Sequence, residues 1–293
     1  MERLSKEEKL KLKNENKILK KERMKKRITE LDFIRGLAII VMIFDHIAYD
    51  FGYLLPTIFK NHPSSDGGVF TDLYYFAKRF WNWQVREDVR YFVLFIFLAL
   101  TGISCSFSRS NLKRGVKLFA FSCLLTLVTY IFGKVTNSRN NTIIFGIIHC
   151  ISISIILVAL MEKFDYGKWT YLLVGLFMIT VGAYIMFINP KIRRAWYGSE
   201  PLLPLLLKAI LGIYDVGSDC YSLLFFGGQV FIGVFLGKLL YKDRKSLIIK
   251  GDYKNNFVTV IGRHSLIIYL LHQIILPVIL SIIMLFCGFK LAL

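Results

Sequence analysis

One stretch of the sequence, residues 28–50, places ionisable side chains inside a segment that is apolar and long enough to cross a bilayer. About 20 residues at 1.5 Å each are sufficient for such a crossing. An ionisable group inside a membrane helix costs on the order of 2.5–3.5 kcal/mol on insertion scales, so its presence predicts a functional site. The ionisable residues of interest here are Asp32, Arg35, Asp45, His46 and Asp50.

His46 is the member of this set best suited to proton transfer, because a neutral imidazole can act as a general base near physiological pH. A neighbouring carboxylate, Asp45 or Asp50, could orient the imidazole, as carboxylates orient histidine in other catalytic sites. We therefore predict His46 as the base, with Asp45 or Asp50 as its partner.

Helical geometry places several of these residues on one face. Arg35 and His46 are eleven positions apart, which at 100° per residue brings them within roughly 20° of the same direction and about 16 Å apart along the axis. Asp32 and Asp50 fall within about 60° of Arg35, and Asp45 lies about 80° to the side. The alternative is that the two ends of the segment reach the two membrane interfaces and their side chains snorkel into water.

The same stretch carries a family resemblance. LDFIRGLAIIVMIFDH is similar to the first membrane helix of the heparan-α-glucosaminide N-acetyltransferase catalytic-domain family, and its Arg-x10-His spacing also resembles the acyltransferase-three group. Two further stretches support the resemblance, LTGISCSFSRSNLKRG at 100–115 and GRHSLIIYLLHQ at 262–273. With SDCYSLLFFGGQVFIGVFLGK at 218–238, it runs from about residue 28 to residue 280.

The resemblance implies a transmembrane acyltransferase that uses acetyl-CoA as its acyl donor. Across the acyltransferase-three group the histidine that ends the Arg-x10-His motif is the expected catalyst, which corresponds to His46. In the lysosomal enzyme that names the family, the matching position carries Asn, and the catalytic histidine lies in the following loop. The histidine of that loop in this chain is His62, in NHPSSDGG, so His62 is the competing candidate.

His272 is a second candidate for catalysis. Ser265, Tyr269 and His272 stand at helical positions i, i+4 and i+7, which lie on one face, and Gln273 is adjacent. The family shows a similar histidine–glutamine pair near its last helix, so we expect His272 to point into the bundle. A catalytic role and an interhelical hydrogen bond that only fixes packing both remain open. We expect His149 to be structural.

A basic cluster in a predicted cytosolic turn could bind the donor. Arg109, Lys113 and Arg114, together with Arg35, could hold the phosphates of coenzyme A. The alternative, which we favour for the turn, is the usual excess of cations on the inner side of a membrane protein. No metal-ligand spacing is present, so no metal is expected.

Composition indicates a polytopic membrane protein. The chain has 293 residues, of which 55% are hydrophobic, and its mean hydropathy is +0.52. A net charge of +18 would suggest a nucleic-acid partner in a soluble protein, but here the cations are segregated between apolar runs, and no nucleic acid is expected. The expected partners are membrane lipids and the acyl acceptor, with self-association into a homo-oligomer left open.

The apolar runs divide the chain into a charged tail at 1–27 and a transmembrane acyltransferase domain at 28–293, an all-α bundle of about seven spans. The long connections at 51–88 and 189–217 are predicted loops, and the run at 202–213 is too short to span. Gly233 and Gly237 are spaced for close helix packing. The last run could be kinked or broken at Pro277. The spans are expected at about 28–50, 89–108, 115–133, 142–161, 169–188, 219–240 and 257–287.

Loop charges predict the orientation. Residues 1–27 alone contain twelve Lys and Arg, and with this tail inside, the inner segments hold about twice as many cations as the outer ones. This places the N-terminus in the cytosol, Arg35 toward the cytosol and His46 toward the outer face of the plasma membrane. The predicted function is transfer of an acyl group, acetyl by preference, from cytosolic acyl-CoA to a sugar, glycan or glycolipid. A transporter or flippase and a non-catalytic sensor or scaffold remain alternatives.

The orientation can be tested by labelling single cysteines introduced into a cysteine-free background. Cysteines within 134–141 should react with an impermeant maleimide in intact cells, because this loop is predicted to be outside. Cysteines within 243–252 should react only after permeabilisation. Labelling of 243–252 in intact cells would contradict the predicted orientation.

Overall fold

The computed structural model describes residues 28–60, 63–65, 67–135, 142–188, 194–195, 201–215, 219–243, 245–247 and 256–291. Within them the fold is helical except for two two-residue strands, β1 (Arg194–Ala195) and β2 (Tyr214–Asp215), which pair in parallel. Five of the described helices are long and apolar enough to cross a membrane. The predicted all-helical membrane fold is therefore confirmed, and the predicted tail at 1–27 lies outside the described residues.

The first described helix, α2 (Thr29–Tyr49), has the length of a membrane span but is not one of those five. Its acidic and basic side chains, which include Glu30, Asp32, Arg35 and Asp45, make its composition more polar than that of an ordinary span. The helix continues into a π turn, η1 (Asp50–Leu54), and a short helix, α3 (Leu55–Ile58).

The segment expected to be a long loop, 51–88, is largely helical. Beyond α3 it contains a 3₁₀ turn, η2 (Pro63–Ser65), and a helix, α4 (Val69–Trp81). Because α5 (Gln84–Cys105) starts five residues before the span predicted at about 89, the charged residues Arg86 and Glu87 also belong to a helix. The prediction of a loop here was wrong because an amphipathic, aromatic-rich helix lacks the continuous apolar run that marks a span.

The middle of the chain follows the predicted spans closely. Two antiparallel pairs are formed by α6 (Asn111–Val135) with α7 (Ile147–Glu162), and by α8 (Lys168–Ala183) with α10 (Gly228–Leu240). α8 continues into a π turn, η4 (Tyr184–Ile188), and another π turn, η5 (Leu223–Gly227), precedes α10. The ten-residue helix α9 (Leu202–Leu211) is too short to span, as expected.

The last apolar run forms two helices, α11 (Phe257–Arg263) and α12 (Ser265–Phe286). The break lies at His264, and α12 runs unbroken through Pro277, so the predicted break at Pro277 was misplaced. Pro277 lacks a backbone N–H, yet neighbouring residues keep the helix intact, as is common in membrane helices.

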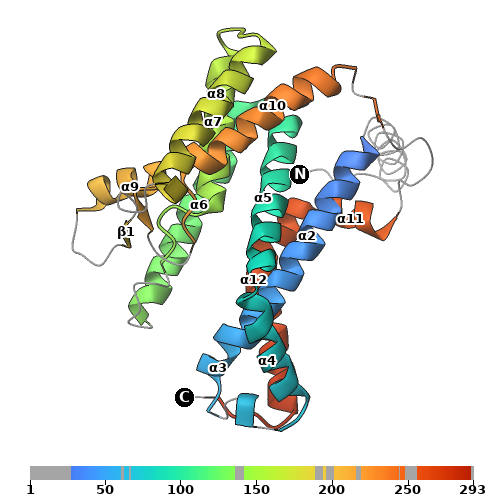
Figure 1. Cartoon of the computed structure of the whole chain (residues 1–293), viewed down its shortest axis with the longest axis vertical. Coiled ribbons are helices and arrows are strands. Elements are labelled where there is room, and N and C mark those ends of the chain that lie inside the picture. The colour runs from blue at the N-terminus through green and yellow to red at the C-terminus, as the bar shows by residue number, and fades with distance from the viewer. Residues whose placement is uncertain are drawn as a thin grey trace, which may run out of the picture.

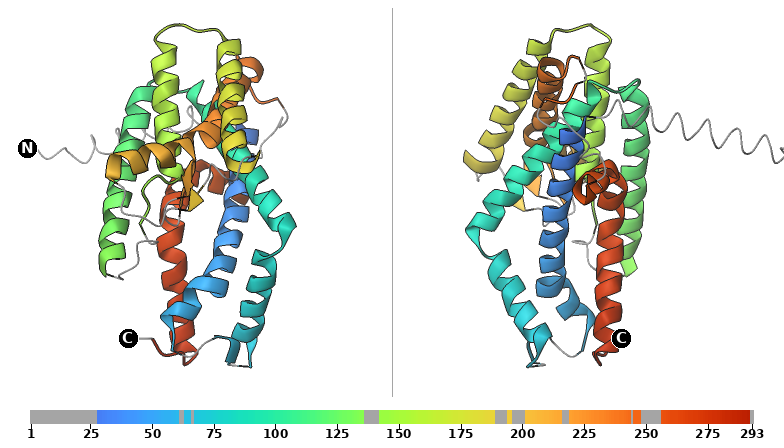
Figure 2. Two further views of the ribbon diagram at one scale, coloured as in Figure 1. Left: turned by 60° about the vertical axis from the view of Figure 1, so that its left-hand side comes forward. Right: turned by 90° about the vertical axis from the view of Figure 1, so that its right-hand side faces the viewer.

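Figure 1 shows how these helices are arranged. α2, α5, α6, α7, α8, α10 and α12 run in alternating directions along the long axis. α5 lies in the middle of the bundle, where it packs on α10 on one side and on α2 on the other. At the lower end in Figure 2, α3, α4 and the end of α12 come together, and Leu55, Phe70 and Met284 pack there.

Glycines allow the closest helix contacts. At the crossing of α2 and α11, a Cβ at Gly262 would lie 1.7 Å from the carbonyl oxygen of Asp32, and one at Gly36 would lie 2.0 Å from that of Val258. At the crossing of α5 and α10, a Cβ at Gly233 would lie 2.1 Å from the carbonyl oxygen of Ala99. Close packing at Gly233 and Gly237 is thus confirmed, because a Cβ at Gly237 would meet Ser106 and Ile103.

Gly262→Ala should destabilise the fold, because the added methyl group would collide with the backbone of α2 rather than with a flexible side chain. Overpacking of this kind costs about 1–3 kcal/mol, so the thermal midpoint of the purified protein should fall by several degrees. Gly52→Ala is the control, since its Cβ would have only ordinary contacts at 3.5 Å or more. Equal midpoints for Gly262→Ala and wild type would contradict the packing at this crossing.

Candidate functional site

Two histidines meet where α2 and α12 lie side by side. The rings of His46 and His272 are 4.6 Å apart between centroids and stand edge to face. His272 is buried, with 6% of its surface exposed, which confirms the prediction that it points into the bundle. His46 is half-buried. The structure therefore brings together the two histidines that the sequence proposed for catalysis, from helices more than 200 residues apart in the chain.

The protonation of His272 follows from its hydrogen bond. Its Nδ1 lies 2.7 Å from the carbonyl oxygen of Tyr269, one turn earlier on α12. A carbonyl oxygen only accepts, so Nδ1 carries the proton and donates it. In the neutral ring Nε2 then has the lone pair, and this buried atom has no hydrogen-bond partner among the described residues.

Gln273 contacts the other histidine. Its side-chain Nε2 lies 3.5 Å from Nδ1 of His46, a long contact between α12 and α2. An amide nitrogen only donates, so Nδ1 of His46 is the accepting atom in this contact. Gln273 itself is exposed in the described structure.

Asp45 binds an arginine rather than His46. Its two carboxylate oxygens accept hydrogen bonds from Arg86 on α5, at 2.6 Å from Nε and 2.7 Å from Nη2. The guanidinium of Arg86 also stacks on the indole of Trp81, with Cζ 3.5 Å from the ring centroid. This two-point ion pair fixes the corner between α4 and α5 against α2, immediately beside His46.

Asp50 is buried, with 5% of its surface exposed, in the π turn that follows α2. Its side chain makes no hydrogen bond or ion pair within the described part of the chain. Next to it, the rings of Tyr49, Tyr53 and Trp81 contact one another at centroid distances of 5.1–5.6 Å. In this structure neither Asp45 nor Asp50 touches the imidazole of His46 through a hydrogen bond, so the predicted orienting role for a carboxylate stays a prediction.

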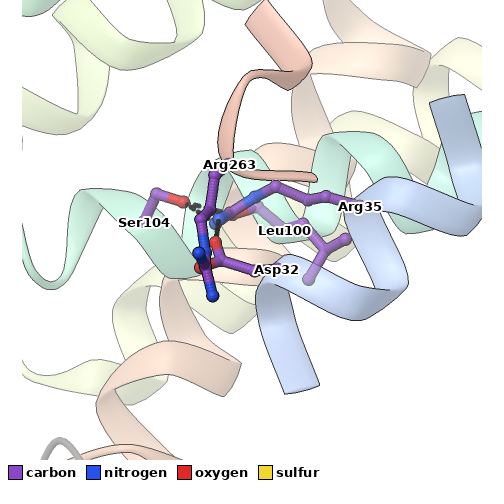
Figure 3. Close-up of polar contacts among 5 residues, drawn as sticks. All are labelled: Asp32, Arg35, Leu100, Ser104 and Arg263. Atoms are coloured by element: carbon purple, nitrogen blue, oxygen red, sulfur yellow. Dashed lines mark hydrogen bonds and ion pairs between the residues drawn. The ribbon is translucent and has the colours of Figure 1, made fainter. Parts of the chain in front are cut away.

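The N-terminal half of α2 carries a second polar cluster, shown in Figure 3. Arg35 donates to Asp32 at 3.1 Å, to the carbonyl oxygen of Leu100 at 3.4 Å and to the hydroxyl of Ser104. Arg263 approaches the other oxygen of Asp32 at 3.8 Å. One carboxylate therefore lies between two guanidinium groups, and the cluster ties α2 to α5 and α11.

The predicted donor-binding cations occupy different surroundings. Arg109 and Lys113 are exposed at the turn between α5 and α6. Arg114 is half-buried and donates to the carbonyl oxygen of Thr101 at 3.4 Å. Arg35 lies within the cluster described above, and it donates to the carbonyl oxygen of Leu100, the residue before Thr101.

The remaining histidines have other roles or lie elsewhere. His149 is buried, and its Nδ1 accepts from the backbone N–H of Gly146 at 3.3 Å while its Nε2 lies 3.2 Å from the hydroxyl of Thr126. Both ring nitrogens have partners, as a structural histidine would, and the structural role expected for His149 stays a prediction. His264 is exposed at the break between α11 and α12. His62, the competing candidate, lies outside the described residues.

Asp219, between β2 and η5, holds the start of α7. Its Oδ2 accepts from the backbone N–H of Ile147 at 3.2 Å, at the positive end of the helix dipole. Loss of surrounding water raises the pKa of Asp219 to about 6, and the hydrogen bond from Ile147 opposes that rise. No group of three or more His, Cys, Asp or Glu that could hold a metal occurs among the described residues.

The fold and the site define a class: an integral membrane protein of long apolar helices that brings two histidines together inside the bundle. Residues 68–274, more than two thirds of the chain, match the family described as heparan-alpha-glucosaminide N-acetyltransferase, catalytic. The chain belongs to this family of membrane acetyltransferases. No curated protein and no solved structure matches it.

The matched region covers part of the site. It includes His272, Gln273, Arg86 and the turn with Arg109, Lys113 and Arg114. It starts after α2, so His46 and the other ionisable residues of α2 lie before it. The family match therefore identifies the class of the protein, while the link between α2 and the rest of the site comes from the contacts between helices.

Sequence reasoning missed two residues of the site. Arg86 was assigned to a loop, although an acidic residue inside a membrane helix, such as Asp45, requires a cationic partner, and Arg86 lies at the edge of the next apolar run. Arg263, within the predicted last span, received no role. Its position next to Gly262, whose lack of a side chain permits the approach to Asp32, was the available signal.

Arg86→Ala should be strongly destabilising, because it leaves the largely buried carboxylate of Asp45 without its partner. Breaking such a pair typically costs about 3–5 kcal/mol, and the double variant Asp45→Asn, Arg86→Ala should regain part of that loss. Glu87→Gln is the control, since its pair with Arg90 is exposed and worth about 0–1 kcal/mol. Thermal midpoints in detergent measure all four proteins, and a double variant less stable than Arg86→Ala would contradict the pairing.

Proposed function

We propose that this protein transfers an acetyl group from acetyl-CoA to a hydroxyl or amino group of a sugar, glycan or glycolipid, and that the reaction takes place at the His46–His272 pair. The family supports a membrane acetyltransferase. The single observation that supports this location is the 4.6 Å contact between the two imidazoles, with a lone pair on one of them buried and unpaired within the described residues.

The chemistry requires one base and one site for the developing negative charge. A neutral imidazole removes the proton of the acceptor as its oxygen or nitrogen attacks the thioester carbonyl. The tetrahedral intermediate carries an oxyanion, which hydrogen-bond donors stabilise. The intermediate then collapses, the carbon–sulfur bond breaks, and the thiolate of coenzyme A leaves and takes up the proton. Two adjacent imidazoles can supply both the base and a donor.

The proposed orientation brings donor and acceptor from opposite sides. With the N-terminus inside, the α5–α6 turn faces the cytosol, where the exposed Arg109 and Lys113 are available to the phosphates of coenzyme A. In this proposal Arg35 and Arg114 lie along the path of coenzyme A from the cytosol to the histidine pair. The roughly 16 Å between Arg35 and His46 along α2 is a distance that the extended arm of coenzyme A can cover.

The acceptor would arrive from the outer side, where Gln273 is exposed and the aromatic group of Tyr49, Tyr53 and Trp81 adjoins α2. In this proposal seven helical segments cross the plasma membrane, namely α2, α5, α6, α7, α8, α10 and α11–α12. Their alternating directions in Figure 1 support an odd number of crossings, with N- and C-termini on opposite sides.

His46→Ala and His272→Ala should each lower acetyl transfer by at least about 10²-fold at matched membrane levels, because each removes a base or a charge-stabilising donor. Activity of the wild type should fall on the acid side, where the base becomes protonated. The assay follows acetyl-CoA consumption and radiolabelled product formation with a panel of amino sugars and glycolipids. His264→Ala, an exposed histidine outside the pair, is the control and should keep wild-type activity.

Three outcomes would contradict the proposal. Wild-type protein that neither transfers nor hydrolyses acetyl-CoA would favour a transporter or scaffold. Full activity in both His46→Ala and His272→Ala would exclude the histidine pair. Loss of activity in His62→Ala, with His46→Ala still active, would move the catalyst to the loop histidine, as in the lysosomal member of the family.

A further inference from the structure

The two histidines of the pair differ in what their ring nitrogens can do. His272 donates from Nδ1 to the carbonyl oxygen of Tyr269 at 2.7 Å, a short bond made within its own helix. A backbone carbonyl cannot change from acceptor to donor, so this bond holds His272 in the form with its lone pair on Nε2. That atom is buried and has no partner in the described structure.

A buried nitrogen without a hydrogen bond is costly, on the order of 1–3 kcal/mol, and such atoms in a folded protein call for an explanation. Nε2 of His272 is in the ring that lies against His46, and the surroundings of α12 on this side are formed by α2 and α5. Because the atom is buried, only a group that enters the bundle can deliver a proton to it, and the Tyr269 carbonyl would stabilise the ring once it has become an imidazolium.

His46 is held in the opposite way. Its Nδ1 faces the amide nitrogen of Gln273 at 3.5 Å and can only accept there. A neutral His46 therefore carries its proton on Nε2, which makes that atom a donor and not a base. The contact is longer than the one that fixes His272, so His46 is the less strongly constrained of the two rings.

Building on the proposed function, we infer that His272 is the general base and that His46 is the donor that stabilises the oxyanion, the reverse of the order that the sequence suggests. Nε2 of His272 takes the proton from the acceptor as the acceptor attacks the thioester carbonyl. Nε2–H of His46 donates to the oxygen that becomes negative. When the carbon–sulfur bond breaks, the imidazolium of His272 returns the proton to the leaving thiolate.

This assignment makes Gln273 a positioning residue. Its amide acts on the reaction through His46 alone, by keeping the acceptor atom of that ring occupied. Tyr269 contributes its backbone carbonyl, and its ring stacks on Phe97 of α5, at 5.7 Å between centroids, which holds this turn of α12 in place. The helix itself thus sets the protonation of the base.

Glutamine substitutions separate the two roles, because glutamine has an N–H donor but no basic nitrogen. His46→Gln should keep activity within about tenfold of wild type, whereas His46→Ala should lose about 10²–10³-fold, the usual effect of removing one oxyanion donor. His272→Gln and His272→Ala should be equally impaired, by about 10²–10⁴-fold, since neither can accept the proton.

The pH profile adds a readout that a structural role would not change. His46→Gln should lose activity at acid pH as the wild type does, because the base is still present. The residual activity of His272→Gln should no longer decrease at acid pH. Nitrogen-15 NMR of histidine-labelled protein in lipid, assigned with the single variants, should show the Nδ1–H form for His272 and the Nε2–H form for His46. Gln273→Ala should change which ring nitrogen of His46 carries the proton and should leave the protonated nitrogen of His272 unchanged.

The outcomes distinguish this inference from the proposed function. One result would overturn the assignment and show that His46 is the base. In it, His46→Gln is as inactive as His46→Ala and no longer loses activity at acid pH, while His272→Gln still does. The protein would still be an acyltransferase. An Nε2–H form for His272 would overturn it as well. If wild-type protein has no acetyl-transfer activity, the proposed function fails, and the assignment of a base and a donor fails with it.

Discussion

The apolar surroundings of a membrane helix bundle require that the ionisable side chains of α2 find partners on other helices, and this requirement shapes the whole molecule. Asp32 and Arg35 are bound by α11 and α5, Glu30 accepts from the backbone N–H of Leu247 at 2.7 Å, and Asp45 is bound by Arg86. α2 is therefore held at several levels along its length by segments that are distant in the chain. Those contacts fix where His46 lies relative to His272.

The two polar clusters of α2 have different consequences. The cluster near the N-terminal end of α2 places a single carboxylate between Arg35 and Arg263, and it holds three helices at one point. The cluster near the C-terminal end of α2 pairs Asp45 with Arg86, and His46 beside it contacts His272 of α12. The ion pairs tie α2 to the other helices, and Nε2 of His272 is one of several buried polar atoms without a hydrogen-bond partner among the described residues.

Apolar runs in the sequence predicted most of the helices, because length and hydropathy are local properties of a span. They predicted neither α4 nor the start of α5, since Phe80, Trp81 and Arg86 mix aromatic and charged side chains within a few residues. The family could be recognised from the order of short motifs along the chain. The pairing of Asp45 with Arg86 and the ring forms of the histidines could not, because they depend on contacts between distant helices and on hydrogen-bond directions.

The π turn at Asp50–Leu54 has a consequence for how this protein can change in evolution. A π turn contains about one residue more than an α turn, so the faces of the following residues are rotated relative to those of α2. Loss of one residue here would leave a continuous α-helix but turn Leu55 and Phe59 away from Met284 and Phe289, and would break the backbone pairing of Phe59 with Leu291. Relatives that share the lower end of this fold should therefore keep the residue count of this turn constant even where its side chains vary.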